Sequence, residues 1–230
     1  MKRTCKTVKM QVLPIKSEES YSWLLQKHYL KRIPSISYAF GLYQDNELVG
    51  VVTYGTPSSS TLRDGVAGPE NAKYVLELNR LCIECKNKNA ASMLVGRSLQ
   101  MLPKPSIVVS YADISQEHVG YVYQACNFIY TGLSAKRTDW KIKGMEQLHG
   151  QTISDISRGC EGSRANFMRD KFGDDFYLED RARKHRYVYV TGKNKEIKLA
   201  IRYKQENYPK GKSKRYDAGG QVQTQSLLFF

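Results

Sequence analysis

Apolar and polar positions in the first 135 residues follow two periods, one of about two residues and one near 3.6, which are typical of strands and helices. Ser17 precedes Glu18 and Glu19, and apolar residues then recur at helical spacing until Pro34, which predicts an N-capped amphipathic helix. The turn-forming run at residues 44–46 separates two apolar segments and predicts a hairpin. The predicted strands are 36–43, 47–54, 73–83, 106–111 and 128–134, and the predicted helices are 18–31, 90–102 and 118–127.

This order predicts an α/β (α+β) fold in which helices flank a mixed central sheet. Residues 55–72 are rich in Gly, Pro and Ser and are expected to form a long loop. Beyond residue 140 the pattern weakens, with helical signals at 150–157 and 165–172 and a strand at 186–190. Residues 195–203 suit a helix or a strand equally. We therefore divide the chain into a catalytic core, 1–140, and a basic C-terminal extension, 141–230, which we expect to pack on the core.

The net charge of the chain indicates what kind of partner it binds. The chain of 230 residues carries 36 Lys and Arg against 22 Asp and Glu, a formal net charge of +14. Between Arg181 and Arg215 there are 13 basic and two acidic residues, a local net of +11. Such an excess, interleaved with tyrosines, favours a polyanion such as nucleic acid. No amphipathic basic helix or lipidation motif supports binding to a membrane.

The five cysteines indicate a reducing compartment. Their number is odd, their neighbours are mostly apolar and no secretory signal precedes them, which favours free thiols in a cytoplasmic protein. Cys82 and Cys85 form one C-x-x-C pair, but a structural zinc site needs a second pair of ligands at suitable spacing. We interpret them as ordinary thiols.

The stretch 110–132 carries the strongest chemical signal. An apolar strand ends in Ser110, Tyr111 and Asp113, so a hydroxyl, a phenol and a carboxylate follow buried backbone. Ligands of open α/β sheets bind at such strand ends. The sequence therefore predicts a site there, with Asp113 as a general base or, alternatively, as the cap of the next segment.

Several short segments in order resemble the phage Mom-type DNA adenine modification proteins, which look like members of the GNAT acetyltransferase superfamily. The resemblance covers residues 27–139 and, more loosely, 183–211. The matching segments are Lys27-His28-Tyr29, Ala39-Phe40-Gly41, Thr53–Glu70, Leu76–Leu81, Asn89-Ala90-Ala91-Ser92, Ser110–Asp113, His118–Ala125, Tyr130-Thr131-Gly132 and Lys184-His185-Arg186-Tyr187.

The resemblance implies a GNAT-like fold and an enzyme that places a carbamoylmethyl (acetamido) group on the exocyclic amine of adenine in double-stranded DNA. That modification would protect phage DNA from host restriction, in the cytoplasm of the bacterial host. It also implies an acyl-CoA-like donor and, as suggested for the family, iron. Two alternatives stay open: a GNAT-type N-acetyltransferase of protein or small-molecule amines, and a non-catalytic DNA-binding protein with a transferase-like fold. The oligomeric state is open, with a dimer among the options.

The predicted catalytic residues surround that strand end. The pair His28 and Tyr29 recurs in the family, although a histidine there also suits the core. We expect His118 to open the helix 118–127, and Tyr123 to face the site and protonate a leaving thiolate. The catalytic set is His28, Tyr29, Ser110, Asp113, His118 and Tyr123.

Two histidines and one carboxylate, namely His28, Asp113 and His118, would suit non-haem iron, which we state as a hypothesis. The usual glycine-rich acetyl-CoA loop is replaced by residues 85–90, which contain no glycine. The start of the following helix could still hold an anion beside Lys86 and Lys88. The predicted cofactor-binding residues are Asn79, Leu81, Asn89 and Ser92.

Basic side chains near both ends are expected to contact phosphates. A paired adenine must leave the duplex to react, so we expect base flipping into a pocket lined by Tyr29, Tyr54, Tyr111 and Tyr123. The predicted DNA-binding residues are Lys31, Arg32, Lys136, Arg137, Lys184, His185 and Arg186.

Overall fold

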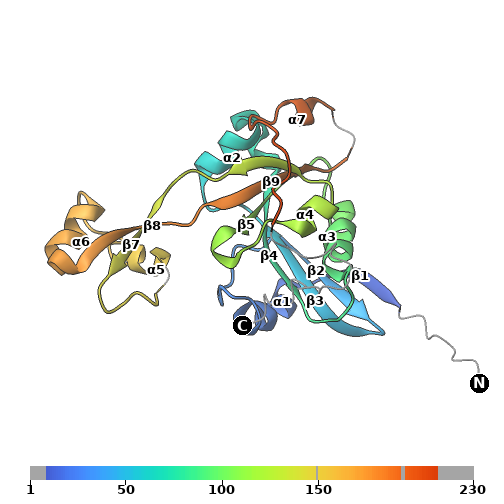
Figure 1. Cartoon of the computed structure of the whole chain (residues 1–230), viewed down its shortest axis with the longest axis horizontal. Coiled ribbons are helices and arrows are strands. Elements are labelled where there is room, and N and C mark those ends of the chain that lie inside the picture. Colours follow the sequence, from blue (N-terminus) through green and yellow to red (C-terminus); the bar gives the residue numbers. More distant parts are fainter. Residues whose placement is uncertain (1–8, 149, 193–194, 212–230) are drawn as a thin grey trace, which may run out of the picture.

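A seven-stranded mixed sheet forms the centre of the molecule (Figure 1). The computed structural model describes residues 9–148, 150–192 and 195–211. The sheet has the order β1-β2-β3-β4-β5-β9-β6, and only β4 and β5 run parallel to each other. Its strands are β1 (Met10–Ile15), β2 (Tyr38–Gln44), β3 (Glu47–Gly55), β4 (Val75–Ile83), β5 (Ile107–Asp113), β6 (Ile129–Leu133) and β9 (Lys184–Val190).

Helices cover both faces of this sheet. One face packs on α3 (Ala90–Met101) and α4 (Tyr121–Ala125) in a cluster that includes Leu94, Val108 and Phe128. The other face packs on α1 (Ser17–Gln26) at one end, and on α2 (Ser60–Ala67) and α7 (Lys195–Leu199) at the other. The predicted fold class, a mixed sheet flanked by helices, is confirmed.

The hairpin between β2 and β3 shows how local sequence sets the register. Asp45 and Asn46 both have positive φ, 49° and 72°. Asn and Asp tolerate this region better than most residues, and two such residues in a row give the tight turn whose twist matches antiparallel strands. The predicted hairpin is confirmed, with its strands at 38–44 and 47–55.

A smaller module projects from one side of the large sheet (Figure 1). Its two strands, β7 (Thr138–Ile142) and β8 (Phe176–Asp180), form a separate antiparallel sheet. Between them lie α5 (Gly150–Asp155), α6 (Arg164–Phe172) and the short 3₁₀ helix η3 (Gly173–Asp175). Ile142, Ile153 and Met168 form its own buried cluster. We call residues 138–180 the side module.

Several predicted elements need correction. The expected loop 55–72 contains α2, capped by the Ser59 side chain, and most of the 3₁₀ helix η1 (Pro69–Tyr74). Helix 18–31 ends already at Gln26, and its N-cap is Lys16, whose N–H donates to Glu19. Helix 118–127 shrinks to Tyr121–Ala125, because Glu117 and Gly120 have positive φ.

Three strands were missed, β1, β7 and β8, and the ambiguous segment after residue 195 is helical as far as Leu199. The division after residue 140 stays a prediction, although β9 brings residues of the C-terminal part into the central sheet. The end of the basic tail, residues 212–230, lies outside the described residues, as does Cys5.

Candidate active site

The candidate site lies where β4 and β5 separate. The parallel pairing is short: it joins residues 75–78 of β4 to residues 107–110 of β5. β4 then continues to Ile83 while β5 continues to Asp113 without further pairing between them. The carboxyl ends of two parallel strands therefore diverge, which is the position where open α/β sheets bind ligands.

A band of polar side chains crosses the sheet at this point. It lies on the face of the sheet that carries α1 and α2, between these two helices. Side chains alternate along a strand, and Val75, Val109 and Val188 face α2. The residues that continue this face toward α1 are polar. We call them the polar band: Glu77 and Arg80 of β4, Tyr111 and Asp113 of β5, and Lys184 and Arg186 of β9.

Asp113 is held in place by three donors. Its Oδ2 lies 2.9 Å from Lys184 Nζ, and its Oδ1 accepts from Ser115 N–H at 3.0 Å and from Ser115 Oγ at 2.7 Å. Partial burial would raise the pKa of Asp113, but the hydrogen bonds from Ser115 and Lys184 outweigh it and hold the pKa below its usual value. Asp113 is thus an anion with its lone pairs largely engaged.

Glu77 is the contrasting carboxylate of the band. Within the described residues its side chain makes no hydrogen bond or ion pair. Burial raises the pKa of Glu77, and the positive charges of Arg80 and Lys184 only partly oppose this. A buried carboxyl with a raised pKa and a free lone pair is suited to accept a proton.

His28 and Tyr29 follow α1, and the charges of Arg80, Lys184 and Asp113 in the band act on them. Their rings stack with centroids 4.6 Å apart. Burial, with the charges of Arg80 and Lys184, lowers the pKa of His28 to about 3, and its Nδ1 accepts from Leu30 N–H at 3.1 Å. Burial and the nearby charge of Asp113 raise the pKa of Tyr29 to about 12. His28 is therefore neutral and Tyr29 keeps its proton near pH 7.

Tyr123 reaches the same place from the opposite face of the sheet. It lies on α4, packs on Tyr187 with ring centroids 5.3 Å apart, and is hydrogen-bonded to the buried Ser110. Burial raises the pKa of Tyr123 to about 12, and the negative charge of Glu77 adds to this effect. Where β4 and β5 diverge, the phenol of Tyr123 on one face of the sheet therefore lies close enough to Glu77 on the other face to respond to its charge.

The proposed pocket of four tyrosines is only partly assembled. Tyr111 lies in the band, and burial followed by the charge of Glu77 raises its pKa. Tyr54 is wrong as a pocket residue. It is fully buried under α3, where its hydroxyl lies 2.6 Å from Ser98 Oγ.

The predicted iron site is not formed. His118 precedes α4, and its backbone N–H donates to the backbone carbonyl of Asp113 at 3.1 Å. Burial lowers the pKa of His118, and only the charge of Asp113 opposes this. Throughout residues 9–148, 150–192 and 195–211, no group of three His, Cys, Asp or Glu side chains is arranged to hold a metal ion. The metal set of His28, Asp113 and His118 is therefore wrong for this arrangement, since Asp113 is already engaged by Lys184 and Ser115.

The predicted cofactor residues fall into two groups. Asn79 links β4 to β3 and to the segment before β2, because it accepts from Thr53 Oγ1 at 2.6 Å and donates to Ser35 O at 2.9 Å. Leu81 packs on the main hydrophobic cluster. Asn89 is the N-cap residue of α3, and Ser92 Oγ donates back to Asn89 O at 3.1 Å. Only the second group lies at a helix start where an anion could bind.

The predicted DNA contacts also divide. Lys31, Arg32, Lys136 and Arg137 are exposed. The other three are engaged internally: Lys184 with Asp113, His185 Nδ1 with Tyr130 Oη at 2.8 Å, and Arg186 with Thr131 Oγ1 at 2.9 Å. The guanidinium of Arg186 also lies 3.4 Å from the centroid of the Tyr203 ring.

Sequence reasoning missed Glu77 and Arg80 as site residues. Arg80 donates to Asn79 O at 2.6 Å and to Arg32 O at 3.4 Å, so it also holds the segment that follows α1. Strict alternation would put Glu77 and Arg80 on opposite faces of the strand, and the register shift between the pairs Tyr54–Leu78 and Thr53–Arg80 brings both to one face.

A family model described as the Mom protein family matches residues 9–210. A relative from Escherichia phage Mu, "Methylcarbamoylase mom", is 31% identical over 194 residues, which cover 80% of this chain and 77% of the relative. The chain belongs to the Mom protein family. This membership confirms the family predicted from the sequence and, with it, the predicted class of protein, a DNA-modifying transferase.

Among solved structures, the chain resembles acetyltransferases at low identity. A GNAT-family acetyltransferase from Bacillus cereus is 13% identical, with a TM-score of 0.41 over 80% of this chain and 99% of that one. A putative acetyltransferase from Salmonella typhimurium, solved with its cofactor acetyl-CoA, is 8% identical, with a TM-score of 0.43 over 81% and 96%. No helix in the described part of the chain is both long and apolar enough to span a bilayer.

Proposed function

We propose that this member of the Mom family transfers a carbamoylmethyl group to the exocyclic amine of adenine in double-stranded DNA. One observation carries the proposal: Glu77, which makes no hydrogen bond or ion pair with any described residue, lies among Tyr111, Tyr123 and Arg80 where β4 and β5 diverge. The phage Mu relative is named a methylcarbamoylase. A site that combines a free carboxylate with protonated phenols suits transfer of a carbon group to a weakly basic amine.

The structure favours Glu77 over the predicted Asp113 as the base. The amine of adenine is a poor nucleophile and must lose a proton as its nitrogen bonds to the donor carbon. Asp113 has a lowered pKa and is engaged by Lys184, whereas Glu77 has a raised pKa and no partner in the described residues. In this proposal Asp113 positions Lys184, and Glu77 takes the proton.

Tyr123 supplies the acid. With a donor that carries the carbamoylmethyl group on sulfur, the amine nitrogen bonds to the methylene carbon while the carbon–sulfur bond breaks. The thiolate leaves with the electron pair and receives the proton of Tyr123, whose pKa of about 12 keeps it protonated until then. His28, being neutral, supports Tyr29 by stacking rather than by charge.

The target base must leave its stack to reach these groups. Enzymes that act on a paired base extrude it and hold it between aromatic side chains. Tyr29, Tyr111 and Tyr123 are the tyrosines of the predicted pocket that surround the site, and stacking on the Tyr29 ring would fix the plane of the adenine. We propose that the enzyme acts on adenine that has been flipped out of the duplex.

For the donor we propose a relative of acyl-CoA that carries the carbamoylmethyl group on its sulfur as a thioether, through the methylene carbon, and whose phosphates lie at the start of α3. That helix begins at Ala90, shortly after Lys86 and Lys88. The Ala90 N–H already donates to Asn87 O at 3.1 Å, so the next N–H groups of the first turn, with the two lysines, favour an anion. We further propose that the enzyme acts in the cytoplasm of the phage-infected bacterium, where the modification protects phage DNA from restriction.

Mass spectrometry of nucleosides from plasmid DNA tests the function. Cells that express the full chain should yield deoxyadenosine bearing one carbamoylmethyl group, and cells with the empty vector should not. Acetylated cellular proteins with unmodified DNA would instead favour an N-acetyltransferase. A chain that binds DNA and yields no product of either kind would be a binding protein, which overturns the proposal.

A further inference from the structure

The side module is joined to the central sheet by two short extended segments that lie against each other. Ser134 N–H donates to Lys184 O and Arg181 N–H donates to Arg137 O, both at 2.8 Å. Residues 134–137 and 181–184 thus form an antiparallel pair, which we call the stalk. Figure 1 shows it as the connection between the module and the rest of the molecule.

The stalk is strongly basic, whereas the module beyond it is acidic. The eight stalk residues include five basic side chains and no acidic one. Residues 138–180 carry six basic and nine acidic side chains, a net of −3 in a chain whose total is +14. Positive charge is therefore concentrated in the connection and not in the module that it carries.

Two of the five basic side chains are available to a partner. Arg181 lies 3.6 Å from Asp139, Lys184 pairs with Asp113, and Arg183 donates to Ser134 O at 2.6 Å. Within the described residues, Lys136 and Arg137 are exposed and their side chains make no hydrogen bond or ion pair. Arg137 also affects the site electrostatically. Burial and the charge of Glu77 raise the pKa of Tyr111, and the positive charge of Arg137 partly opposes this rise.

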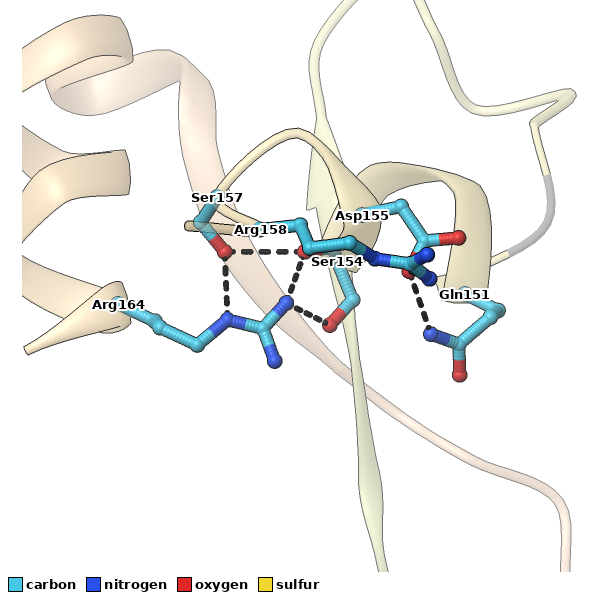
Figure 2. Close-up of polar contacts among 6 residues, drawn as sticks. All are labelled: Gln151, Ser154, Asp155, Ser157, Arg158 and Arg164. Atoms are coloured by element: carbon cyan, nitrogen blue, oxygen red, sulfur yellow. Dashed lines mark hydrogen bonds and ion pairs between the residues drawn. The ribbon is translucent and has the colours of Figure 1, made fainter. Parts of the chain in front are cut away.

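The module itself is internally braced, because side-chain hydrogen bonds join its helices. Figure 2 shows Arg164 of α6 reaching back to α5, with Nε 2.9 Å from Ser157 Oγ and Nη2 3.0 Å from Ser154 Oγ. Asp155 Oδ1 accepts from Gln151 at 2.9 Å and from Arg158 at 2.7 Å.

The charge of Arg32, in the segment after α1, also acts on α5. The pKa of Asp155 is lowered first by its hydrogen bonds with Gln151 and Arg158, and the positive charge of Arg32 adds to this effect.

We infer that the stalk is the phosphate-binding surface for duplex DNA, and that the side module is a rigid arm that limits where the duplex can lie. This inference rests on the proposed function and assigns the phosphate contacts to Lys136 and Arg137 instead of the engaged Lys184, His185 and Arg186. The acidic module repels a duplex that would pass over it, which leaves the stalk and the polar band at its base as the favoured path.

The test compares two double variants of the full chain. Lys136→Ala with Arg137→Ala removes the two free stalk charges. Arg169→Ala with Lys171→Ala removes two exposed charges from α6 and serves as the matched control. The dissociation constant for a duplex oligonucleotide is measured across a range of salt concentrations. Each lost phosphate contact reduces the slope of log affinity against log salt by about 0.9. We expect the stalk variant to lose about 2 from this slope and the α6 variant to match the wild type.

Nucleoside mass spectrometry on the same proteins separates the possible failures. If the wild type modifies adenine and the stalk variant keeps the wild-type slope, the inference is overturned while the proposed function stands. An equal loss of slope in both variants also overturns it, because the contact would then be spread over the surface. If the wild type yields no modified adenine but the stalk variant alone loses slope, the proposed function fails and the DNA-binding surface stands.

Discussion

Two polar clusters in this molecule contain similar groups and differ in how completely those groups are paired. In the side module, the Asp155 carboxylate accepts from Gln151 and Arg158, and these bonds lower its pKa. In the polar band, Glu77 has no partner among the described residues, and burial raises its pKa. A cluster that only supports the fold satisfies its polar groups. A titratable group left unpaired beside phenols and cations is the more informative sign of chemistry.

The largest expected effect separates these two carboxylates. Glu77→Gln keeps the size of the side chain and removes its ability to take a proton, so adenine modification should fall by roughly 10²- to 10⁴-fold. Asp155→Asn is the matched control and should leave modification unchanged. The fraction of modified deoxyadenosine, at equal amounts of folded protein, is the measurement. Wild-type modification by Glu77→Gln would remove Glu77 from the mechanism.

The second prediction concerns whether the two regions also fold as separate units. Ile153 is fully buried in the cluster of the module with Ile142 and Met168. Ile153→Ala opens a cavity and should destabilise the module by about 3 kcal/mol. Hydrogen exchange should then rise in α5, α6, β7 and β8 and stay unchanged in α3. Leu94→Ala, in the main cluster, is the comparison variant and should increase exchange throughout the large sheet. Increased exchange in α3 on Ile153→Ala would show one cooperative unit.

The third prediction is a gradual pH dependence of stability that arises beside the polar band. The pKa of His28 is about 3 in the folded protein against 6.5 for an ordinary histidine. Between these values the unfolded chain binds a proton that the folded chain does not, so stability falls as the pH falls through this window. The slope from this group is about 1.4 kcal/mol per pH unit. Denaturant unfolding at several pH values measures it, and the difference between wild type and His28→Gln isolates it from the carboxyl groups. Identical slopes in the two proteins would contradict the burial of a neutral His28.

Much of the fold and part of the site could be predicted because they depend on local pattern. The apolar run before Ser110, the hairpin at residues 44–46 and the helix after Asn89 each carry their own signal. Helix α2 was missed because Pro57, Gly65, Gly68 and Pro69 hide an eight-residue helix that its Ser59 cap and tertiary packing stabilise.

Residue partners far apart in the chain could not be predicted. Nothing in the local pattern of 184–190 says that it pairs with both β5 and β6, and this pairing is what puts Lys184 on Asp113. The same contact turned the predicted base into an engaged anion and changed the roles of Lys184, His185 and Arg186. Glu77 became the stronger candidate only when the neighbouring strands defined its face.

The placement of β9 between β5 and β6 has a consequence for biosynthesis. Strands β1 to β6 leave the ribosome before the module and before residue 184, yet among the described strands only β9 is hydrogen-bonded to β6. Pairings between segments so distant in sequence form slowly, because the intervening chain must first be brought together. A nascent chain that stops short of residue 190 would hold nearly all the residues of the catalytic site without the strand that organises them. The enzyme should therefore gain activity abruptly, late in its own translation.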